Sequence, residues 1–279
     1  IALALELEKF KISSLIIEAG KNNFSDESQK FYDGTIIGDE YPPLNVTRLR
    51  QFGGSSGHWG GMCRSLDDHD FVNWPINKKD LDSYANRTKN IIKLKRNNFY
   101  KKKFDNNFDL VKFEVSPLRF RDKYKKDIKD SKYIHLVMEA YVTKLEGDKK
   151  INKIFINYKE KNFSLKSKYF VLACGGIENS KLMHLVRKNN PNMLDPRMPI
   201  GNYFLEHPYN DIGEAFIDIK NFNNFLKKKS LENSIKVNCD WWFTLASNQK
   251  FVKENNILDS VMFINIVYKN INVKNKSFI

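Results

Sequence analysis

The chain has 279 residues, of which 41% are hydrophobic, enough for one large domain or two ordinary ones, and it has no apolar run of about 18 residues that could cross a membrane. The net charge of +14 would suit a nucleic acid or a membrane surface, but the lysines are scattered rather than gathered on one face, which disfavours both partners. The three cysteines, Cys63, Cys174 and Cys239, form no CxxC pair, so neither a disulfide framework nor a zinc site is expected.

The first ten residues, IALALELEKF, have the pattern of an amphipathic helix, and residues 13–20, SSLIIEAG, that of a short buried strand. A helix that leads into a strand ending in an acidic residue, here Glu18, is typical of the second half of a dinucleotide-binding βαβ unit. In such a unit the carboxylate accepts hydrogen bonds from the hydroxyl groups of the adenosine ribose. The GxGxxG motif of the unit does not occur in the chain and is expected before Ile1.

Residues 48–64, RLRQFGGSSGHWGGMCR, contain five glycines, two serines, one histidine and one tryptophan, without helical or strand periodicity. Flexible Gly/Ser linkers lack tryptophan, histidine and flanking arginines, so we expect an ordered loop. The glycine pairs, Gly53 with Gly54 and Gly60 with Gly61, permit positive φ and a close approach of the backbone to a flat or charged group. The pattern indicates a loop that lies along a bound cofactor, with a flexible linker as the alternative.

Between this loop and residue 130 the sequence predicts few regular elements. Asn77 can cap a helix that continues over residues 78–92, and residues 93–130 form a charged, variable insertion that is partly strand. Residues 67–70, Asp-Asp-His-Asp, could suggest a metal site. A solvated acidic turn is the preferred interpretation, because the run presents no second set of ligands, and no metal site is therefore expected.

The second half of the chain begins with strand patterns. Residues 133–166 predict a strand with a turn and two further strands, which together form a three-stranded meander. Residues 169–174, YFVLAC, predict a buried strand that runs into Gly175 and Gly176 and then a helix, whose N-terminus would favour an anionic or electron-rich group. Further strands are expected within residues 213–219, 234–246 and 259–268.

Four stretches together resemble the glucose–methanol–choline (GMC) family of FAD-dependent oxidoreductases. They are LIIEAG at 15–20, GGSSGHWGG at 53–61, ACGGIENSKLM at 173–183 and MPIGNYFLEHP at 198–208. Within the family they are most similar to the sugar-oxidising branch, which includes the pyranose oxidases and the fructose and gluconate dehydrogenases.

The resemblance implies an α/β fold: an FAD-binding, Rossmann-like domain of the two-dinucleotide-fold type with a three-stranded β-meander, and the start of an α+β substrate domain. It assigns the first part of the FAD-binding domain to residues 1–75, a helix and the variable insertion to 76–130, the second part of the FAD-binding domain to 131–205 and the start of the substrate domain to 206–279. The chain is expected to be a fragment that lacks both ends of the parent protein.

The resemblance also implies how FAD is held. Glu18 would bind the ribose, the backbone of Val142 the adenine edge, and the 53–62 loop the pyrophosphate and the flavin ring. His58 falls where pyranose oxidase carries a histidine bonded covalently to the flavin, and an unmodified hydrogen-bonding role is the alternative. The expected FAD-binding residues are Glu18, Arg50, Gly53, Gly54, Ser55, Ser56, His58, Trp59, Gly60, Met62, Val142, Ala173, Cys174, Gly175, Asn179, Asn202 and His207.

The implied activity is the oxidation of an alcohol group, on a sugar or polyol, by hydride transfer to flavin N5. The resemblance implies that the catalytic histidine of the family would lie beyond residue 279, so no catalytic residue is expected within the chain. The electron acceptor stays open between oxygen, a quinone and a haem partner. The alternatives are a non-catalytic or degenerate flavin-binding fragment and a basic nucleic-acid-binding protein. A cytoplasmic location is expected, while the missing N-terminus leaves room for an export signal.

Overall fold

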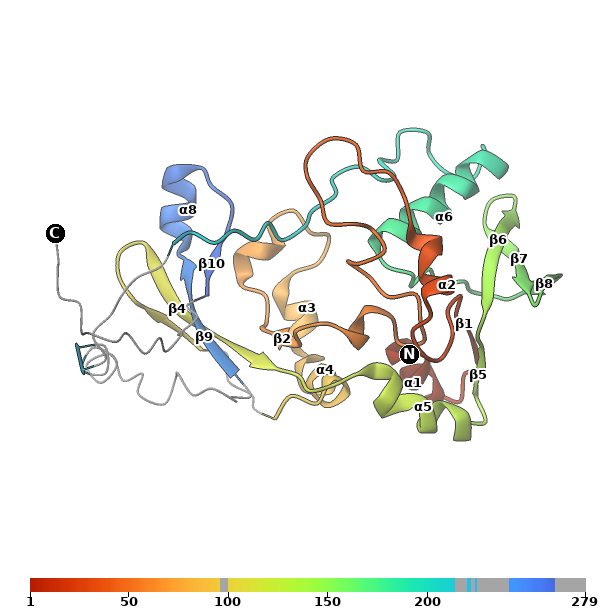
Figure 1. Cartoon of the computed structure of the whole chain (residues 1–279), viewed down its shortest axis with the longest axis horizontal. Coiled ribbons are helices and arrows are strands. Elements are labelled where there is room, and N and C mark those ends of the chain that lie inside the picture. Colours follow the sequence, from red (N-terminus) through yellow and green to blue (C-terminus); the bar gives the residue numbers. More distant parts are fainter. Residues whose placement is uncertain (96–99, 214–219, 222–223, 225–240, 264–279) are drawn as a thin grey trace, which may run out of the picture. The chain divides into compact units, whose positions relative to one another are not determined.

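The computed structural model describes residues 1–95, 100–213, 220–221, 224 and 241–263 (Figure 1). It is a mixed α/β structure with one parallel and two antiparallel sheets in this described part. The chain divides into two compact units. The first unit consists of Ile1–Trp59 and Arg119–Glu214, and the second of Gly60–Leu118 and Ala215–Ile279. Across the described ranges, no helix combines the length and the apolar character needed to cross a bilayer.

The first unit contains a parallel pair of strands. Helix α1 (Ala2–Lys9) leads into β1 (Ser14–Ile17), which lies parallel to β5 (Ile134–Val137). The predicted helix and strand are thus present, but β1 is half-buried with Leu15 exposed rather than buried. The ladder continues past β1, since the backbone N–H of Glu18 donates to the carbonyl of Val137 at 2.9 Å. Helix α5 (Phe120–Asp130), which the sequence analysis did not predict, packs against β5.

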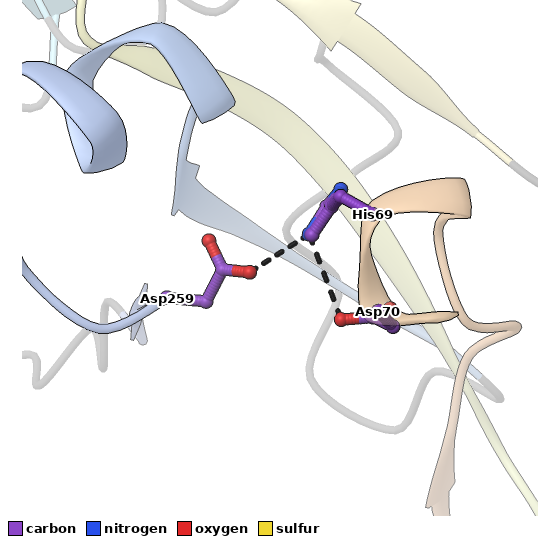
Figure 2. Close-up of side chains that lie close together, drawn as sticks. All are labelled: His69, Asp70 and Asp259. Carbon is purple, nitrogen blue, oxygen red and sulfur yellow. Dashed lines mark hydrogen bonds and ion pairs between the residues drawn. The ribbon is translucent and has the colours of Figure 1, made fainter. Parts of the chain in front are cut away.

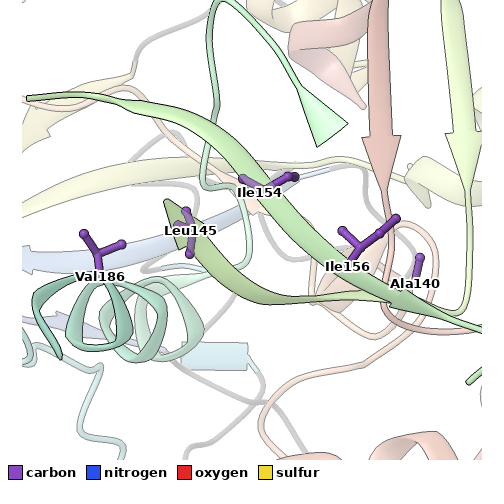
Figure 3. Close-up of a cluster of buried hydrophobic side chains, with 5 residues drawn as sticks. All are labelled: Ala140, Leu145, Ile154, Ile156 and Val186. Carbon is purple, nitrogen blue, oxygen red and sulfur yellow. The ribbon is translucent and has the colours of Figure 1, made fainter. Parts of the chain in front are cut away.

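The predicted meander is confirmed from residue 140 onward, whereas residues 134–137 of its expected first strand form β5 and belong to the parallel pair. Strands β6 (Ala140–Gly147), β7 (Ile151–Tyr158) and β8 (Lys161–Lys166) form an antiparallel sheet in sequence order. The predicted helix after the glycine pair is α6 (Gly176–Asn189), which packs against β6. Figure 3 shows the resulting core, in which one helical side chain meets four from the strands. The cluster comprises Ala140, Leu145, Ile154, Ile156 and Val186.

The predicted buried strand at residues 169–174 is wrong, because these residues form an irregular loop. Their side chains nevertheless alternate between the core and solvent: Phe170 and Leu172 pack against the core, whereas Tyr169 and Val171 are 75% and 62% exposed. A strand also needs a hydrogen-bonded neighbour. Within the described residues β1 pairs with β5 alone and β8 with β7 alone, so no ladder includes this segment.

The stretch between β1 and the glycine-rich loop is more ordered than its composition suggests. It contains α2 (Asp26–Gln29) and the short 3-10 helix η1 (Lys30–Tyr32). The side chain of Ser25 accepts a hydrogen bond from the backbone N–H of Ser28, which caps α2. The glycine-rich loop itself contains a second 3-10 helix, η2 (Gly54–Gly57).

The second unit is built on an antiparallel sheet. Its long strand, β4 (Phe108–Val115), lies between β9 (Trp241–Ser247) and β2 (Met62–Cys63). The edge strand β10 (Val261–Met262) pairs with β9, and β3 (Lys101–Lys103) pairs with β4. The strands expected within residues 234–246 and 259–268 are thus present in part. The expected strand at 213–219 lies outside the described residues except for residue 213. Residues 234–240 and 264–268 of the other two expected strands also lie outside them, as does Cys239.

The second unit also contains short helices. Asn77 caps α3 (Lys78–Asp82) as predicted, accepting hydrogen bonds from the N–H groups of Lys79 and Asp80. The helix predicted to continue to residue 92 is interrupted, and α4 (Ala85–Ile92) begins as a separate helix. Two further helical elements of this unit are the 3-10 helix η3 (Asp68–Phe71) and α8 (Gln249–Asn255).

Candidate cofactor-binding site

The first group of the candidate site is the carboxylate of Glu18, at the carboxyl end of β1. Its Oε1 accepts a hydrogen bond from the backbone N–H of Gly20 at 2.7 Å, which fixes the side chain beside its own turn. Burial raises the pKa of Glu18, and the Gly20 N–H and the charge of Arg50 oppose that rise. In sheets of parallel strands, ligands bind at this end of the strands, where the carboxylate can accept hydroxyl hydrogen bonds.

The start of the glycine-rich loop lies directly on this turn. Residues Lys21 and Gln51 form a parallel bridge, and the N–H of Phe52 donates to the carbonyl of Lys21 at 2.9 Å. A Cβ atom on Gly20 would lie 2.5 Å from the carbonyl carbon of Arg50, a distance that real Cβ contacts do not reach. Two segments that the sequence analysis singled out separately are therefore in contact.

A buried glutamine from α2 holds the entry to the loop. Gln29 is 6% exposed, and its Oε1 accepts a hydrogen bond from the backbone N–H of Arg50 at 3.0 Å. Its Nε2 donates to the carbonyl of Asn45 at 2.6 Å and to that of Arg48 at 2.5 Å. One side chain thus satisfies backbone groups at three positions of the incoming segment, which orders it without regular secondary structure.

The two arginines of the loop stack on consecutive aromatic rings of η1. The guanidinium of Arg48 lies 4.0 Å from the ring centroid of Tyr32, and that of Arg50 lies 4.3 Å from that of Phe31. Arg50 is buried and also donates to the hydroxyl of Ser28 at 2.7 Å, and burial lowers its pKa. Arg50 was expected to contact the cofactor, and in the described structure its side chain orders the loop.

The tip of the loop is the 3-10 helix η2. Gly53, which precedes the helix, has φ +89°, and Gly54 has φ +56°, so both glycines adopt the left-handed backbone conformation. The hydroxyl of Ser55 accepts from the N–H of Leu49 at 3.2 Å, and that of Ser56 donates to the carbonyl of Gly53 at 2.7 Å. Local hydrogen bonds therefore shape the loop, in agreement with an ordered segment rather than a flexible linker.

The end of the loop reaches the boundary of the first unit. His58, which follows η2, is exposed, and Trp59 is half-buried. Gly60 and Met62 belong to the second unit, where Met62 lies in β2 opposite Val115 and is 41% exposed. The expected cofactor residues of this loop are thus divided between the two units.

The turn before α6 is the third part of the candidate site. The backbone N–H of Cys174 donates to Oδ1 of Asn179 at 2.9 Å, while Asn179 Nδ2 donates to the carbonyl of Leu172 at 3.3 Å. Gly175 has φ +86°, and a Cβ atom built on it would have nothing within 4 Å. The turn, which also contains the exposed Ala173, therefore presents open backbone at the N-terminus of a 14-residue helix.

Electrostatic interactions connect this turn to Glu18 and to the loop. Partial desolvation raises the pKa of the Cys174 thiol, and the negative charges of Glu18 and Glu178 add to the effect. Arg48 forms an ion pair with Glu178 in the first turn of α6, at 3.1 Å, with both side chains less than 20% exposed. Neither Arg48 nor Glu178 was expected at the site. Arg48 lies in the stretch 48–64 and Glu178 in the stretch 173–183, but their pairing depends on the tertiary fold.

Three further expected residues belong to the first unit, and of these Val142 lies two residues after Ala140, whose backbone N–H donates to the carbonyl of Glu18 at 3.0 Å. Val142 lies in β6 opposite Ile156 at a β-bulge and packs against the core cluster. Asn202 and His207 are exposed in an irregular segment, where the N–H of His207 donates to Glu206 at 2.9 Å. The structure thus brings together Glu18, the loop entry and the turn at 173–179.

These three groups suit a nucleotide cofactor. A carboxylate at a strand end can accept ribose hydroxyls, and free N–H groups at the start of a long helix can bind phosphate oxygens. The open backbone at Gly175 allows a ligand to approach the start of α6 closely. No protein-family model matches the chain, and no curated protein is significantly similar to it in sequence. The assignment of a function therefore depends on the four sequence stretches described above and on this geometry.

Proposed function

We propose that the chain is the FAD-binding part of a GMC-type oxidoreductase that oxidises an alcohol group of a sugar or polyol. The observation that carries the proposal is the position of Glu18, half-buried at the carboxyl end of β1 and in contact, through Gly20, with the glycine-rich loop. A parallel strand pair, an acidic residue at the strand end and a glycine turn before a long helix are the elements from which dinucleotide sites are built.

Each element has a role in this proposal. Glu18 accepts hydrogen bonds from the adenosine ribose, and the N–H groups around Gly175 bind an anionic or electron-rich part of the cofactor. The backbone of Val142 contacts the adenine edge, and the loop tip around Ser55 and His58 lies along the flavin. FAD supplies the redox chemistry by accepting a hydride at N5, while the protein binds and orients it. The base that removes the hydroxyl proton is not assigned to any residue of this chain.

His58 is proposed to contact the flavin, and a covalent bond through its ring, as in pyranose oxidase, is one of two outcomes. It is exposed at the end of η2, so its ring is accessible to a ligand that lies on the loop. Its backbone N–H donates to the carbonyl of Ser55 at 3.2 Å, which fixes the main chain and leaves the imidazole available. The other outcome is an unmodified histidine that hydrogen-bonds to the flavin.

An absorption spectrum of the purified protein tests the proposal. We expect flavin bands in the visible range, which stay with the acid-precipitated pellet if His58 is the tether and pass into the supernatant if FAD is bound non-covalently. A well-folded preparation that has no flavin and does not bind added FAD would refute the flavoprotein assignment. Bound flavin that no sugar or polyol reduces would favour a non-catalytic flavin-binding protein.

Paired variants locate the site. Glu18→Gln keeps the size of the side chain and an acceptor for the Gly20 N–H but weakens the hydrogen bonds to the ribose, so FAD binding should fall at least tenfold. The control is Glu27→Gln on α2, whose side chain is 83% exposed and pairs with Lys21 at 3.3 Å. Equal FAD affinity in the two variants would remove Glu18 from the site.

A further inference from the structure

A histidine and two aspartates converge in the second unit (Figure 2). The Nε2 atom of His69 lies 2.7 Å from Oδ2 of Asp259 and 3.6 Å from Oδ1 of Asp70. One potential ligand atom from each of the three residues lies within 4.8 Å of the other two. In the sequence, the run at 67–70 has no further candidate ligand nearby. In the fold, Asp259, from the distant loop before β10, supplies one.

Asp70 is held in place by the helix that contains it. The backbone N–H of Asp67 donates to Oδ2 of Asp70 at 2.7 Å, as part of a capping box at the start of η3. Oδ2 is thereby engaged, and Oδ1 is the oxygen that faces His69. Asp67 itself is paired with Arg64 at 2.8 Å and is not a member of the cluster. The cap therefore orients one carboxylate oxygen toward the imidazole.

Asp259 is held in the same manner from the other side. Oδ1 accepts a hydrogen bond from Nε2 of Gln249, in the first turn of α8, at 3.1 Å, while Oδ2 faces His69. The next residue is anchored to β9, because the backbone N–H of Ser247 donates to the carbonyl of Ser260 at 2.9 Å and the N–H of Ser260 donates to the Ser247 hydroxyl at 3.0 Å. Supporting hydrogen bonds of this kind orient the ligands of protein metal sites.

We propose that His69, Asp70 and Asp259 bind one divalent transition-metal ion, with Zn²⁺ as the ion best suited. The two carboxylates carry two negative charges, which a divalent cation neutralises. Imidazole nitrogen with carboxylate oxygen is a zinc donor set, whereas Mg²⁺ and Ca²⁺ prefer oxygen ligands alone. Ligand atoms about 2.0–2.2 Å from a tetrahedral Zn²⁺ lie roughly 3.4 Å from one another, so only small side-chain movements are required.

In the metal-free chain, His69 and Asp259 share a hydrogen bond at 2.7 Å. Metal binding replaces the proton on Nε2 of His69 with the ion, and that proton moves to solvent or to Nδ1. Three protein ligands leave a fourth position of Zn²⁺ open for water or a small anion, which is the arrangement of catalytic rather than structural zinc sites. None of the three residues is among those proposed to bind FAD, so failure of either proposal leaves the other intact.

Calorimetric titration of the full chain with Zn²⁺, after removal of metals with a chelator, tests the site. We expect one equivalent to bind, and Asp259→Asn to weaken that binding at least tenfold. The matched control is Asp68→Asn, in the same 3-10 helix as Asp70 but outside the cluster, which should leave the affinity within twofold of wild type. Absence of Zn²⁺ binding, or equal loss in both variants, would overturn the proposal.

Cobalt absorption gives a second readout that does not depend on affinity alone. Co²⁺ at the site should give visible ligand-field bands, and His69→Gln should remove the nitrogen donor and change their position and intensity. Far-UV circular dichroism of each variant establishes that it is folded. Wild-type bands that persist in folded His69→Gln would show that the ion binds elsewhere and would overturn the assignment.

Discussion

Gly20 and Arg50 lie in direct contact through their backbones. A Cβ atom on Gly20 would be 2.5 Å from the carbonyl carbon of Arg50 and 2.6 Å from Cα of Gln51. Real Cβ atoms do not approach other atoms so closely, so any side chain here would displace the loop from the end of β1. Position 20 requires glycine because there is no room for a Cβ atom, not because of its backbone conformation. The close contact places the loop entry beside Glu18.

The variant Gly20→Ala should therefore destabilise the first unit. Overpacking against backbone that cannot move costs about 1–3 kcal/mol, which a lower denaturation midpoint in urea would report. Gly176→Ala is the control, because a Cβ atom built there has nothing within 4 Å and alanine favours a helix. Equal stabilities of the two variants would show that the loop does not lie on the strand end.

Gly53 and Gly54 provide a second matched pair. Both have positive φ, so alanine is strained at either position by about 1 kcal/mol. Only at Gly53 would a Cβ atom also approach the backbone nitrogen of Arg121, at 2.9 Å, whereas nothing lies within 4 Å at Gly54. Thermal unfolding should show a larger loss of stability for Gly53→Ala than for Gly54→Ala. The reverse order would mean that η2 does not pack on the start of α5.

The elements that the sequence predicted are those whose signals are local. Asn77 caps α3 because its side chain reaches N–H groups two and three residues away, and the meander follows from alternating side chains and turn residues. The predicted strand at 169–174 had the correct alternation but failed, because pairing depends on a neighbouring strand that the pattern cannot reveal.

The same distinction applies to the two candidate sites. Glu18 and Gly175 could be selected from the sequence because a strand end and a glycine turn are visible in it. The role of Gln29, which binds three backbone positions, could not, since nothing in DESQ indicates which loop will pack on it. Asp259 likewise has no sequence signal that connects it with His69, and only the fold of the second unit brings the two together.

The ion pair between Arg48 and Glu178 should contribute measurably to stability. Both side chains are largely shielded from solvent, and the pair joins the loop entry to α6. In a double-mutant cycle with Arg48→Met and Glu178→Gln, we expect a coupling energy of about 1 kcal/mol from urea denaturation. The matched pair is Asp195 with Arg197, at 2.9 Å but well exposed, which should show no measurable coupling. Similar coupling in both cycles would contradict the burial of the first pair.

Glu18 should make the flavin-free protein less stable as the pH rises. Burial raises its pKa above the usual 4.5, so the folded chain holds this proton more tightly than the unfolded chain does. The resulting stabilisation is fully present below pH 4.5 and is lost as the pH rises through the pKa of the folded state.

Urea midpoints measured between pH 4 and pH 8 test this expectation. Glu18→Gln cannot ionise at this position and keeps an oxygen that accepts from the Gly20 N–H, so it should gain stability relative to wild type as the pH rises. Glu27→Gln, on an exposed side chain, should follow the wild-type curve. Parallel curves for wild type and Glu18→Gln would mean that the carboxylate is not desolvated. A divergence would show that the ionised carboxylate of Glu18 costs stability in its half-buried position.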